Sequence, residues 1–290
     1  MTAATPQIDP EILYVDNHLL VAVKDPGVLS QSDGSQTPDM LTLLKASIRL
    51  RYQKPGDVFL GLVHRLDQPV GGVMVFARTS KAAGRLSGQI REHRLEKYYL
   101  AVVHGCPEPP GGQLTDHLQK AAGNNQVRVV TDGSGRLAWL HYVSLAADKK
   151  SGFSLLGIRL GTGRPHQIRV QLASRGWPIV GDRRYGLPDD QQTLGQDSQI
   201  ALFACALGFL HPTRAEPLFF AALPPDRSPW NLFASVITPN LRPFFAATAC
   251  SQNVNENSSA RSTDWNRRSC YNGITRQGLP GNTRQSACEP

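Results

Sequence analysis

Two short polar clusters contain the residues whose types and spacing could carry chemistry. The first covers residues 61–72, where Arg65 and Asp67 lie between an apolar approach and a glycine-flanked apolar run. The second covers residues 161–169 and combines two arginines, a histidine and a side-chain amide. A carboxylate beside a guanidinium group stays ionised and keeps one orientation, as nucleophilic or base chemistry requires. The two clusters together indicate an aspartate held between guanidinium groups.

Each cluster also has a purely structural interpretation when it is taken alone. Asp67 precedes a glutamine and a proline, and aspartate is a common turn or cap residue. The arginines of the second cluster could face solvent, where an ion pair contributes little to stability. His166 could be a structural histidine whose ring nitrogens are satisfied inside the protein. The residues by themselves leave these alternatives open.

Most of the elements that must position the two clusters are predicted to be strands. Short apolar runs bounded by turn residues are typical of strands. Such runs occupy residues 19–23, 72–77, 98–103, 126–130, 138–145, 154–160, 200–210 and 217–223. Strands outnumber helices and do not alternate with them, which predicts an α+β fold with a mixed, largely antiparallel sheet and flanking helices.

One predicted helix opens with Thr79 or Ser80 as its N-cap residue. Three apolar residues at helical spacing predict the side that faces the core, namely Ala82, Leu86 and Ile90. Four basic residues predict the opposite, solvated surface: Lys81, Arg85, Arg91 and Arg94.

A second predicted helix begins after the turn at residues 161–163, takes Pro165 into its first turn and ends before Gly176. Ile168 and Leu172 are four residues apart and are predicted to face the core. His166 and Arg169 are three apart and share another face. We expect that face to form a wall of the site.

Composition divides the chain into three parts. Folding is expected to begin near residue 12, after a short leader at residues 1–11, and to continue as one body through residues 12–239. Ser, Asn, Thr, Gln, Gly and Arg dominate residues 240–290, which predicts a disordered basic tail. This tail has six arginines and three acidic residues, so it carries +3 of the formal net charge of +8. The excess of positive charge favours a polyanionic partner.

Several common classes of site are not indicated by the sequence. It contains no Walker loop, no dinucleotide-binding glycine motif and no zinc-protease or serine-hydrolase motif. Its five cysteines form no C-x-x-C pair and have no metal-ligand spacing with the histidines. No apolar run is as long as a membrane span, and the N-terminus lacks the pattern of a secretory signal. We therefore expect a cytoplasmic protein that binds no membrane and no metal.

Five segments resemble, in order and spacing, the motifs of the RluA family of RNA pseudouridine synthases. They are residues 64–67 with Gly72, residues 97–101 with Gly105, residues 163–169, residues 178–186, and residues 211–212. The resemblance covers residues 12–225 and implies the catalytic domain of that family. Residues 68–71 depart from the family pattern, which affects the expected loop geometry and RNA contacts. The leader leaves no room for the RNA-binding S4 module that many members carry.

The resemblance implies a role for each matching side chain. Asp67 matches the catalytic aspartate, Arg169 the arginine that pairs with it, and Tyr99 the tyrosine that stacks on the target base. Arg65 matches a residue that fills the space left when the uridine flips out. RNA contacts are further expected from four residues, some of which could instead order the loop: His64, Arg164, His166 and Gln167.

The function implied by the resemblance is the isomerisation of uridines to pseudouridine in structured RNA, either rRNA or tRNA, by a monomer. No step of that reaction moves electrons or needs a Lewis acid, so no cofactor is expected. A non-catalytic RNA-binding protein on the same fold is the alternative. An aspartate-dependent hydrolase or nuclease is a further alternative, but it would need clustered carboxylates near Asp67 where the motifs supply arginines.

Overall fold

The computed structural model describes residues 9–53, 56–121, 123, 126–188, 190 and 199–237. The predicted tail at residues 240–290 and most of the predicted leader lie outside the described residues. Within the described part of the chain, no helix is long and apolar enough to cross a membrane.

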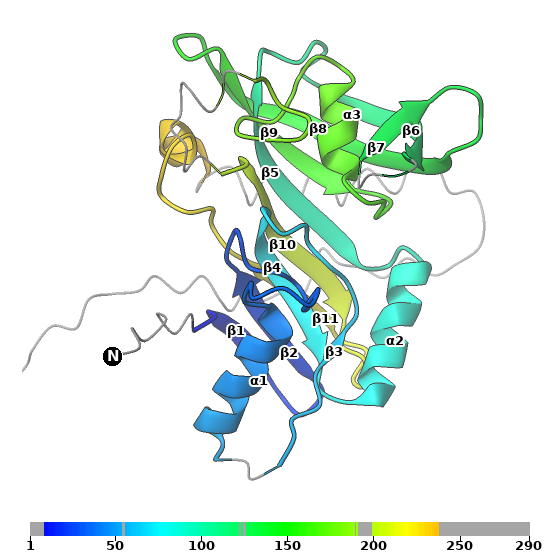
Figure 1. Ribbon diagram of the computed structural model, residues 1–290, viewed down its shortest axis with the longest axis vertical. Coiled ribbons are helices and arrows are strands. Elements are labelled where there is room, and N and C mark those ends of the chain that lie inside the picture. The colour runs from blue at the N-terminus through cyan, green and yellow to red at the C-terminus, as the bar shows by residue number, and fades with distance from the viewer. Residues whose placement is uncertain are drawn as a thin grey trace, which may run out of the picture.

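An eleven-stranded sheet forms the body of the protein (Figure 1). Its strands are β1 (Ile12–Val15), β2 (Leu19–Lys24), β3 (Gly61–Leu62), β4 (Gly71–Ala77), β5 (Glu96–His104), β6 (Gly111–Lys120), β7 (Val127–Val130), β8 (Arg136–Asp148), β9 (Phe153–Leu160), β10 (Leu202–Leu210) and β11 (Pro217–Ala221). Their order is β1-β2-β4-β10-β5-β9-β8-β6-β7, with β3 paired to β4 and β11 to β10. All of these pairs are antiparallel except β4–β10. The predicted α+β fold with a mixed, largely antiparallel sheet is confirmed.

Three α-helices and a short 3-10 helix flank the described sheet: α1 (Met40–Arg51), α2 (Ser80–Arg91), α3 (Gln167–Ala173) and η1 (Trp230–Phe233). The hydroxyl of Thr79 caps α2 by accepting a hydrogen bond from the backbone N–H of Ala82 at 3.1 Å, as predicted. Asp39 caps α1 in the same way through the N–H of Thr42. The sequence analysis did not identify α1, β1 or β6.

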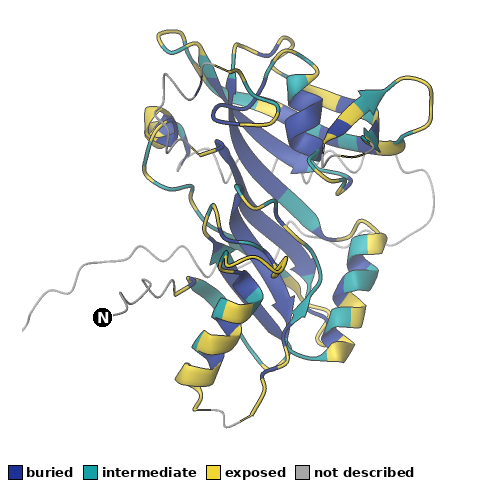
Figure 2. Ribbon diagram, viewed as in Figure 1, coloured by how far each residue is buried: buried dark blue, intermediate teal, exposed yellow. Residues whose placement is uncertain are grey.

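Strands β2 and β4 are buried on both faces (Figure 2). Alternate residues of a strand point to opposite faces. On one face Leu20 and Met74 join a cluster that includes Leu44 of α1, and on the other Val21 and Val75 pack with Leu86 of α2. Burial on both faces explains why these strands appear in the sequence as continuous apolar runs rather than alternating ones.

The single parallel pair sets the position of the first polar cluster. Gly71 and Gly72, at the start of β4, pair with Phe203 and Ala204 of β10. Gly72 has a φ of +132°, and a Cβ atom there would lie 2.3 Å from the carbonyl oxygen of Ala204. Only glycine fits such a close backbone approach. The loop of residues 63–70 therefore leads into β4 beside the start of β10.

Helix α3 begins later than the sequence predicted. Pro165 was expected in its first turn, but the helix starts at Gln167, and His166 before it has a left-handed backbone with φ +51°. The side chain of Gln167 accepts hydrogen bonds from the Arg164 N–H at 3.1 Å and from the Thr162 hydroxyl at 2.8 Å. These bonds close residues 162–167 into a loop, which takes the place of the expected first helical turn.

Candidate active site

Asp67 lies in the loop between β3 and β4, and buried contacts hold the backbone on both sides of it. The Ser30 hydroxyl donates to the carbonyl of Leu66 at 2.8 Å and accepts from the N–H of the same residue at 3.1 Å. On the other side, the Nζ atom of Lys24 donates to the carbonyl of Gln68 at 2.9 Å. The carboxylate is therefore presented by a loop that is tied to two other segments of the chain.

Lys24 is a site residue that the sequence analysis missed. Its side chain is fully buried at the end of β2. Burial lowers the pKa of Lys24 to about 7, whereas the nearby charges of Asp67 and Asp25 act to raise it. A lysine that ends an apolar strand directly before a turn was the available signal, but such a residue usually projects into solvent.

Arg169 links Asp67 to a second carboxylate. Its Nη1 atom lies 3.0 Å from Oδ2 of Asp67, while Nε and Nη2 lie 2.8 and 2.6 Å from the two carboxylate oxygens of Asp182. The side chains of Arg169 and Asp182 are 7% and 0% exposed, against 29% for Asp67. Burial alone would lower the pKa of Arg169, but the two carboxylates raise it above its ordinary value. The guanidinium of Arg169 is thus a permanent positive charge, and the buried carboxylate of Asp182 fixes its position.

The expected arrangement around Asp67 is confirmed for one arginine and wrong for the others. Among the described residues, Arg169 is the only arginine in an ion pair with Asp67. Arg65 is exposed, and Nε of Arg164 donates to the carbonyl of Leu137 at 3.0 Å. Asp67 is therefore held on one side by a guanidinium and is not enclosed between two.

Tyr99 lies in β5 and is 7% exposed. Burial raises the pKa of its phenol well above the ordinary value, and the negative charge of Asp67 raises it further. The charge of Asp67 thus acts on the Tyr99 phenol. Tyr99 is therefore a largely buried, neutral aromatic ring.

The remaining predicted residues fall into different places. Oε1 and Nε2 of Gln167 bond to Thr162, Arg164 and Trp139, so this amide orders the loop. Nε2 of His64 accepts a hydrogen bond from the backbone N–H of Val75 at 3.1 Å. Burial lowers the pKa of His64 to about 3, with a further contribution from Lys97. His64 is thus a neutral residue bonded to β4, which does not support its predicted contact with RNA.

His166 and Arg169 approach the same oxygen of Asp67, as the predicted shared face requires. Nε2 of His166 lies 3.9 Å from Oδ2 of Asp67. On its other side, Nδ1 lies 2.8 Å from the hydroxyl of Tyr185. The sequence analysis did not identify Tyr185 or Asp182 as site residues, although both fall in the segment of residues 178–186 that resembles a family motif.

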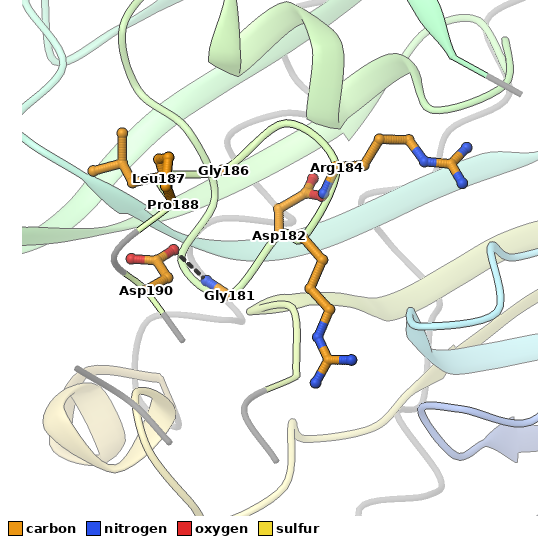
Figure 3. A pocket seen from close by; sticks show the side chains of 8 residues that line it. Gly181, Asp182, Arg184, Gly186, Leu187, Pro188 and Asp190 are labelled. Atoms are coloured by element: carbon orange, nitrogen blue, oxygen red, sulfur yellow. Dashed lines mark hydrogen bonds between the residues drawn. The ribbon is translucent and has the colours of Figure 1, made fainter. Parts of the chain in front are cut away.

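A cavity of about 330 Å³ adjoins Asp182 and is lined by residues 181–184, 186–188 and 190 (Figure 3). Asp190 closes the turn at its base by accepting a hydrogen bond from the N–H of Gly181 at 2.8 Å. Within the part of the chain that the structure describes, no group of three or more His, Cys, Asp and Glu side chains is arranged to hold a metal ion.

Comparison with known proteins places this site in a family. Residues 18–174 match the family described as RNA pseudouridylate synthase. The chain is 33% identical to the ribosomal large subunit pseudouridine synthase D of Zymomonas mobilis over 74% of this chain and 70% of that protein. It is 35% identical to the protein of the same name from Xylella fastidiosa, over 78% of this chain and 69% of the relative.

Solved structures agree at the level of the fold. The human RNA pseudouridylate synthase domain containing 4 protein has a TM-score of 0.61 at 22% identity, covering 74% of this chain and 88% of that one. The human RNA pseudouridylate synthase domain containing 1 protein has a TM-score of 0.60 at 22% identity, covering 81% of this chain and 98% of that one. The family match spans more than half of the chain, and the bacterial relatives exceed 30% identity over two thirds of their length. This chain therefore belongs to the RNA pseudouridylate synthase family, whose members are isomerases that convert uridine to pseudouridine in RNA.

Proposed function

We propose that this chain modifies uridines of ribosomal large-subunit RNA and that Asp67 is its catalytic residue. The observation that supports this proposal is the ion pair between Asp67 and Arg169. Arg169 donates one hydrogen bond to Oδ2 of Asp67 and two to the carboxylate of Asp182, which fixes the guanidinium. The names of the bacterial relatives favour ribosomal RNA over tRNA as the substrate. The net charge of +8 suits a polyanionic partner.

The reaction breaks the N1–C1′ bond of uridine and forms a C5–C1′ bond, while C5 loses a proton and N1 gains one. Asp67 can act by nucleophilic attack or by removing a proton from the sugar, and both routes need an ionised carboxylate of fixed orientation. Arg169 occupies Oδ2, and Oδ1 has no hydrogen-bond partner among the described residues. We assign Oδ1 as the oxygen that faces the substrate.

Two further roles complete this proposal. Tyr99 stacks on the target base, because an aromatic face holds a uracil in any rotation within the pocket. Arg65 is exposed two residues before Asp67, where its cation can fill the space left by the flipped nucleotide and contact phosphate. Flipping costs a few kcal/mol of stacking, so a group that occupies the gap stabilises the open RNA.

The organisation of the protein belongs to the same proposal. We take residues 12–239 as the catalytic domain and the protein as a monomer in the cytoplasm. RNA contacts from Arg164 and His64 stay predictions, since their side chains already bond within the protein.

The test is pseudouridine mapping of total RNA from cells that lack this protein and from cells rescued with wild type, Asp67→Asn or Asp57→Asn. The asparagine keeps the size of the side chain and removes its charge. Asp57 is a matched control because its side chain is fully exposed and pairs only with Arg49 among the described residues. We expect sites in large-subunit rRNA to vanish and to return with wild type and Asp57→Asn. Return of the sites with Asp67→Asn would instead favour a non-catalytic RNA-binding protein.

A further inference from the structure

We propose that His166 is a positioning residue for Asp67 and that Tyr185 holds it as the neutral tautomer whose proton is on Nε2. In this arrangement an N–H group, and not a cation, faces Oδ2 of the carboxylate, the oxygen that also pairs with Arg169. The inference rests on the proposed role of Asp67, and it adds two residues that act through that carboxylate rather than on the RNA.

The hydrogen bonds of Tyr185 decide the tautomer. Its hydroxyl oxygen accepts a hydrogen bond from the backbone N–H of Val127 in β7 at 2.9 Å. A phenol has a single proton, and among the described residues the only acceptor near it is Nδ1 of His166 at 2.8 Å. The hydroxyl therefore donates to Nδ1, which leaves the ring proton on Nε2, the nitrogen 3.9 Å from Asp67 Oδ2.

Packing holds both rings in this geometry. The rings of His166 and Tyr185 meet edge to face with their centroids 5.6 Å apart. The guanidinium of Arg169 lies over the ring of Tyr185 at 5.2 Å. His166 has a left-handed backbone with φ +51°, a conformation that non-glycine residues rarely adopt and that is found at sites where the surrounding structure fixes it.

Burial favours the neutral form of His166, and the charges that surround it come from several elements. Burial is the largest effect and lowers its pKa, while two carboxylates raise it and two guanidinium groups lower it. The groups that face the ring are Asp67, Asp182, Arg169, Arg184 and the neutral phenol of Tyr185.

A neutral His166 matters because it shares Oδ2 of Asp67 with Arg169. A neutral N–H can steady that oxygen without withdrawing the carboxylate's charge from the reaction. A charged imidazolium would form a second ion pair and weaken Asp67 as a nucleophile or base. The present 3.9 Å separation is longer than a hydrogen bond, and catalytic hydrogen bonds often shorten when substrate binds.

The first measurement is ¹⁵N NMR of the histidine ring nitrogens in the full chain, with the His166 signals assigned by their loss in His166→Asn. Asparagine suits this position because it tolerates a left-handed backbone better than most residues. We expect wild type to show protonated Nε2 and unprotonated Nδ1 at pH 7. A proton on Nδ1, or on both nitrogens, would overturn the assignment.

The second measurement is the pH dependence of tritium release from C5 during single turnover, with [5-³H]uridine-labelled total RNA from cells lacking the protein. Tyr185→Phe keeps the ring against Arg169 but frees Nδ1 to take a proton. Without the Tyr185 donor, Nδ1 takes a proton more easily, so the pKa of His166 should rise above its wild-type level and the rate at pH 5.5 should fall below the variant's own plateau. In wild type the Tyr185 hydroxyl still occupies Nδ1, so its rate at pH 5.5 should fall less than that of Tyr185→Phe.

Two comparisons separate this effect from general damage. The double variant Tyr185→Phe/His166→Asn has no group to titrate and should lose the extra fall at pH 5.5. Tyr14→Phe, which removes a hydroxyl from the separate cluster around Asp16, should keep the wild-type profile. The inference is overturned if the pH profile of Tyr185→Phe is parallel to that of wild type, or if the double variant keeps the fall in rate at pH 5.5. In either case, an inactive Asp67→Asn would still support the proposed function. An active Asp67→Asn defeats the proposed function itself.

Discussion

Asp182→Asn removes a charge from the buried side of Arg169 without changing the size of the side chain. In the wild type, Oδ1 of Asp182 accepts from Nη2 of Arg169 and from the backbone N–H groups of Arg184 and Tyr185, while Oδ2 accepts from Nε of Arg169. The asparagine oxygen can keep the Oδ1 contacts. Its NH₂ group then meets Nε–H of Arg169 donor to donor, so one charge-assisted hydrogen bond is lost.

The expected cost follows from this geometry. Loss of a hydrogen bond to a charged group costs about 1.5–3 kcal/mol, and the loss of a buried ion-pair partner costs about 3–5 kcal/mol. Because asparagine retains one of the two contacts and Asp67 still pairs with Arg169, we expect about 2–3 kcal/mol. In a domain of this size each kcal/mol lowers Tm by about 2–4 °C, so a fall of about 4–12 °C is expected.

Catalysis should fall as well, because Arg169 no longer keeps one orientation toward Asp67. We expect the single-turnover rate of tritium release to drop about 10- to 100-fold, which corresponds to about 1.4–2.8 kcal/mol of transition-state stabilisation. Asp116→Asn is a matched control, because the side chain of Asp116 is only 8% exposed, pairs with Arg175 at 2.9 Å and accepts a hydrogen bond from Gln171 at 2.7 Å. It should lower Tm without a comparable loss of rate. A wild-type rate in Asp182→Asn, or an equal loss in both variants, would refute the reasoning.

Three further outcomes test other parts of the structure. Gly72→Ala should lower the free energy of unfolding by more than about 2 kcal/mol, because the added Cβ atom would collide with the backbone of β10. Gly84→Ala on α2 should not, because nothing lies within 4 Å of that position. Urea titration measures both variants. Burial alone would raise the pKa of Asp16, but hydrogen bonds from two backbone N–H groups and from His211 hold it below the ordinary value. Stability from Asp16 is therefore present above about pH 4 and lost as pH falls further, so Asp16→Asn should show a smaller loss of urea midpoint between pH 6 and pH 3 than wild type. Tyr99→Leu should lower kcat/KM about 5- to 150-fold through the loss of about 1–3 kcal/mol of stacking, whereas Tyr99→Phe, which keeps the ring, should lose much less. Equal losses in the two variants would exclude stacking as the reason.

The errors in the sequence-based prediction have physical causes. Strand β6 escaped notice because only Leu114 and Leu118 of its residues are buried, so it lacks an apolar run. Helix α1 has a basic, exposed side and a narrow apolar stripe. The start of α3 was wrong because the side chain of Gln167 satisfies the loop that precedes the helix, and a side-chain bond of this kind has no periodic pattern.

The sequence by itself determined the local elements and the order of the motifs. Apolar runs predicted the central strands because burial on both faces leaves a continuous pattern. The pairing of Asp67 with Arg169 was expected from the types of the two clusters and from the family resemblance.

The tertiary structure alone decided which charges meet. Asp67 and Arg169 are 102 residues apart in the chain, and the buried Lys24, Asp182 and the Tyr185–His166 pair join them only after the sheet has set its register. Local propensity depends on neighbours within a few residues. Contacts between distant segments depend on strand register and packing, which the whole fold decides, so the residues around the carboxylate became visible only in three dimensions.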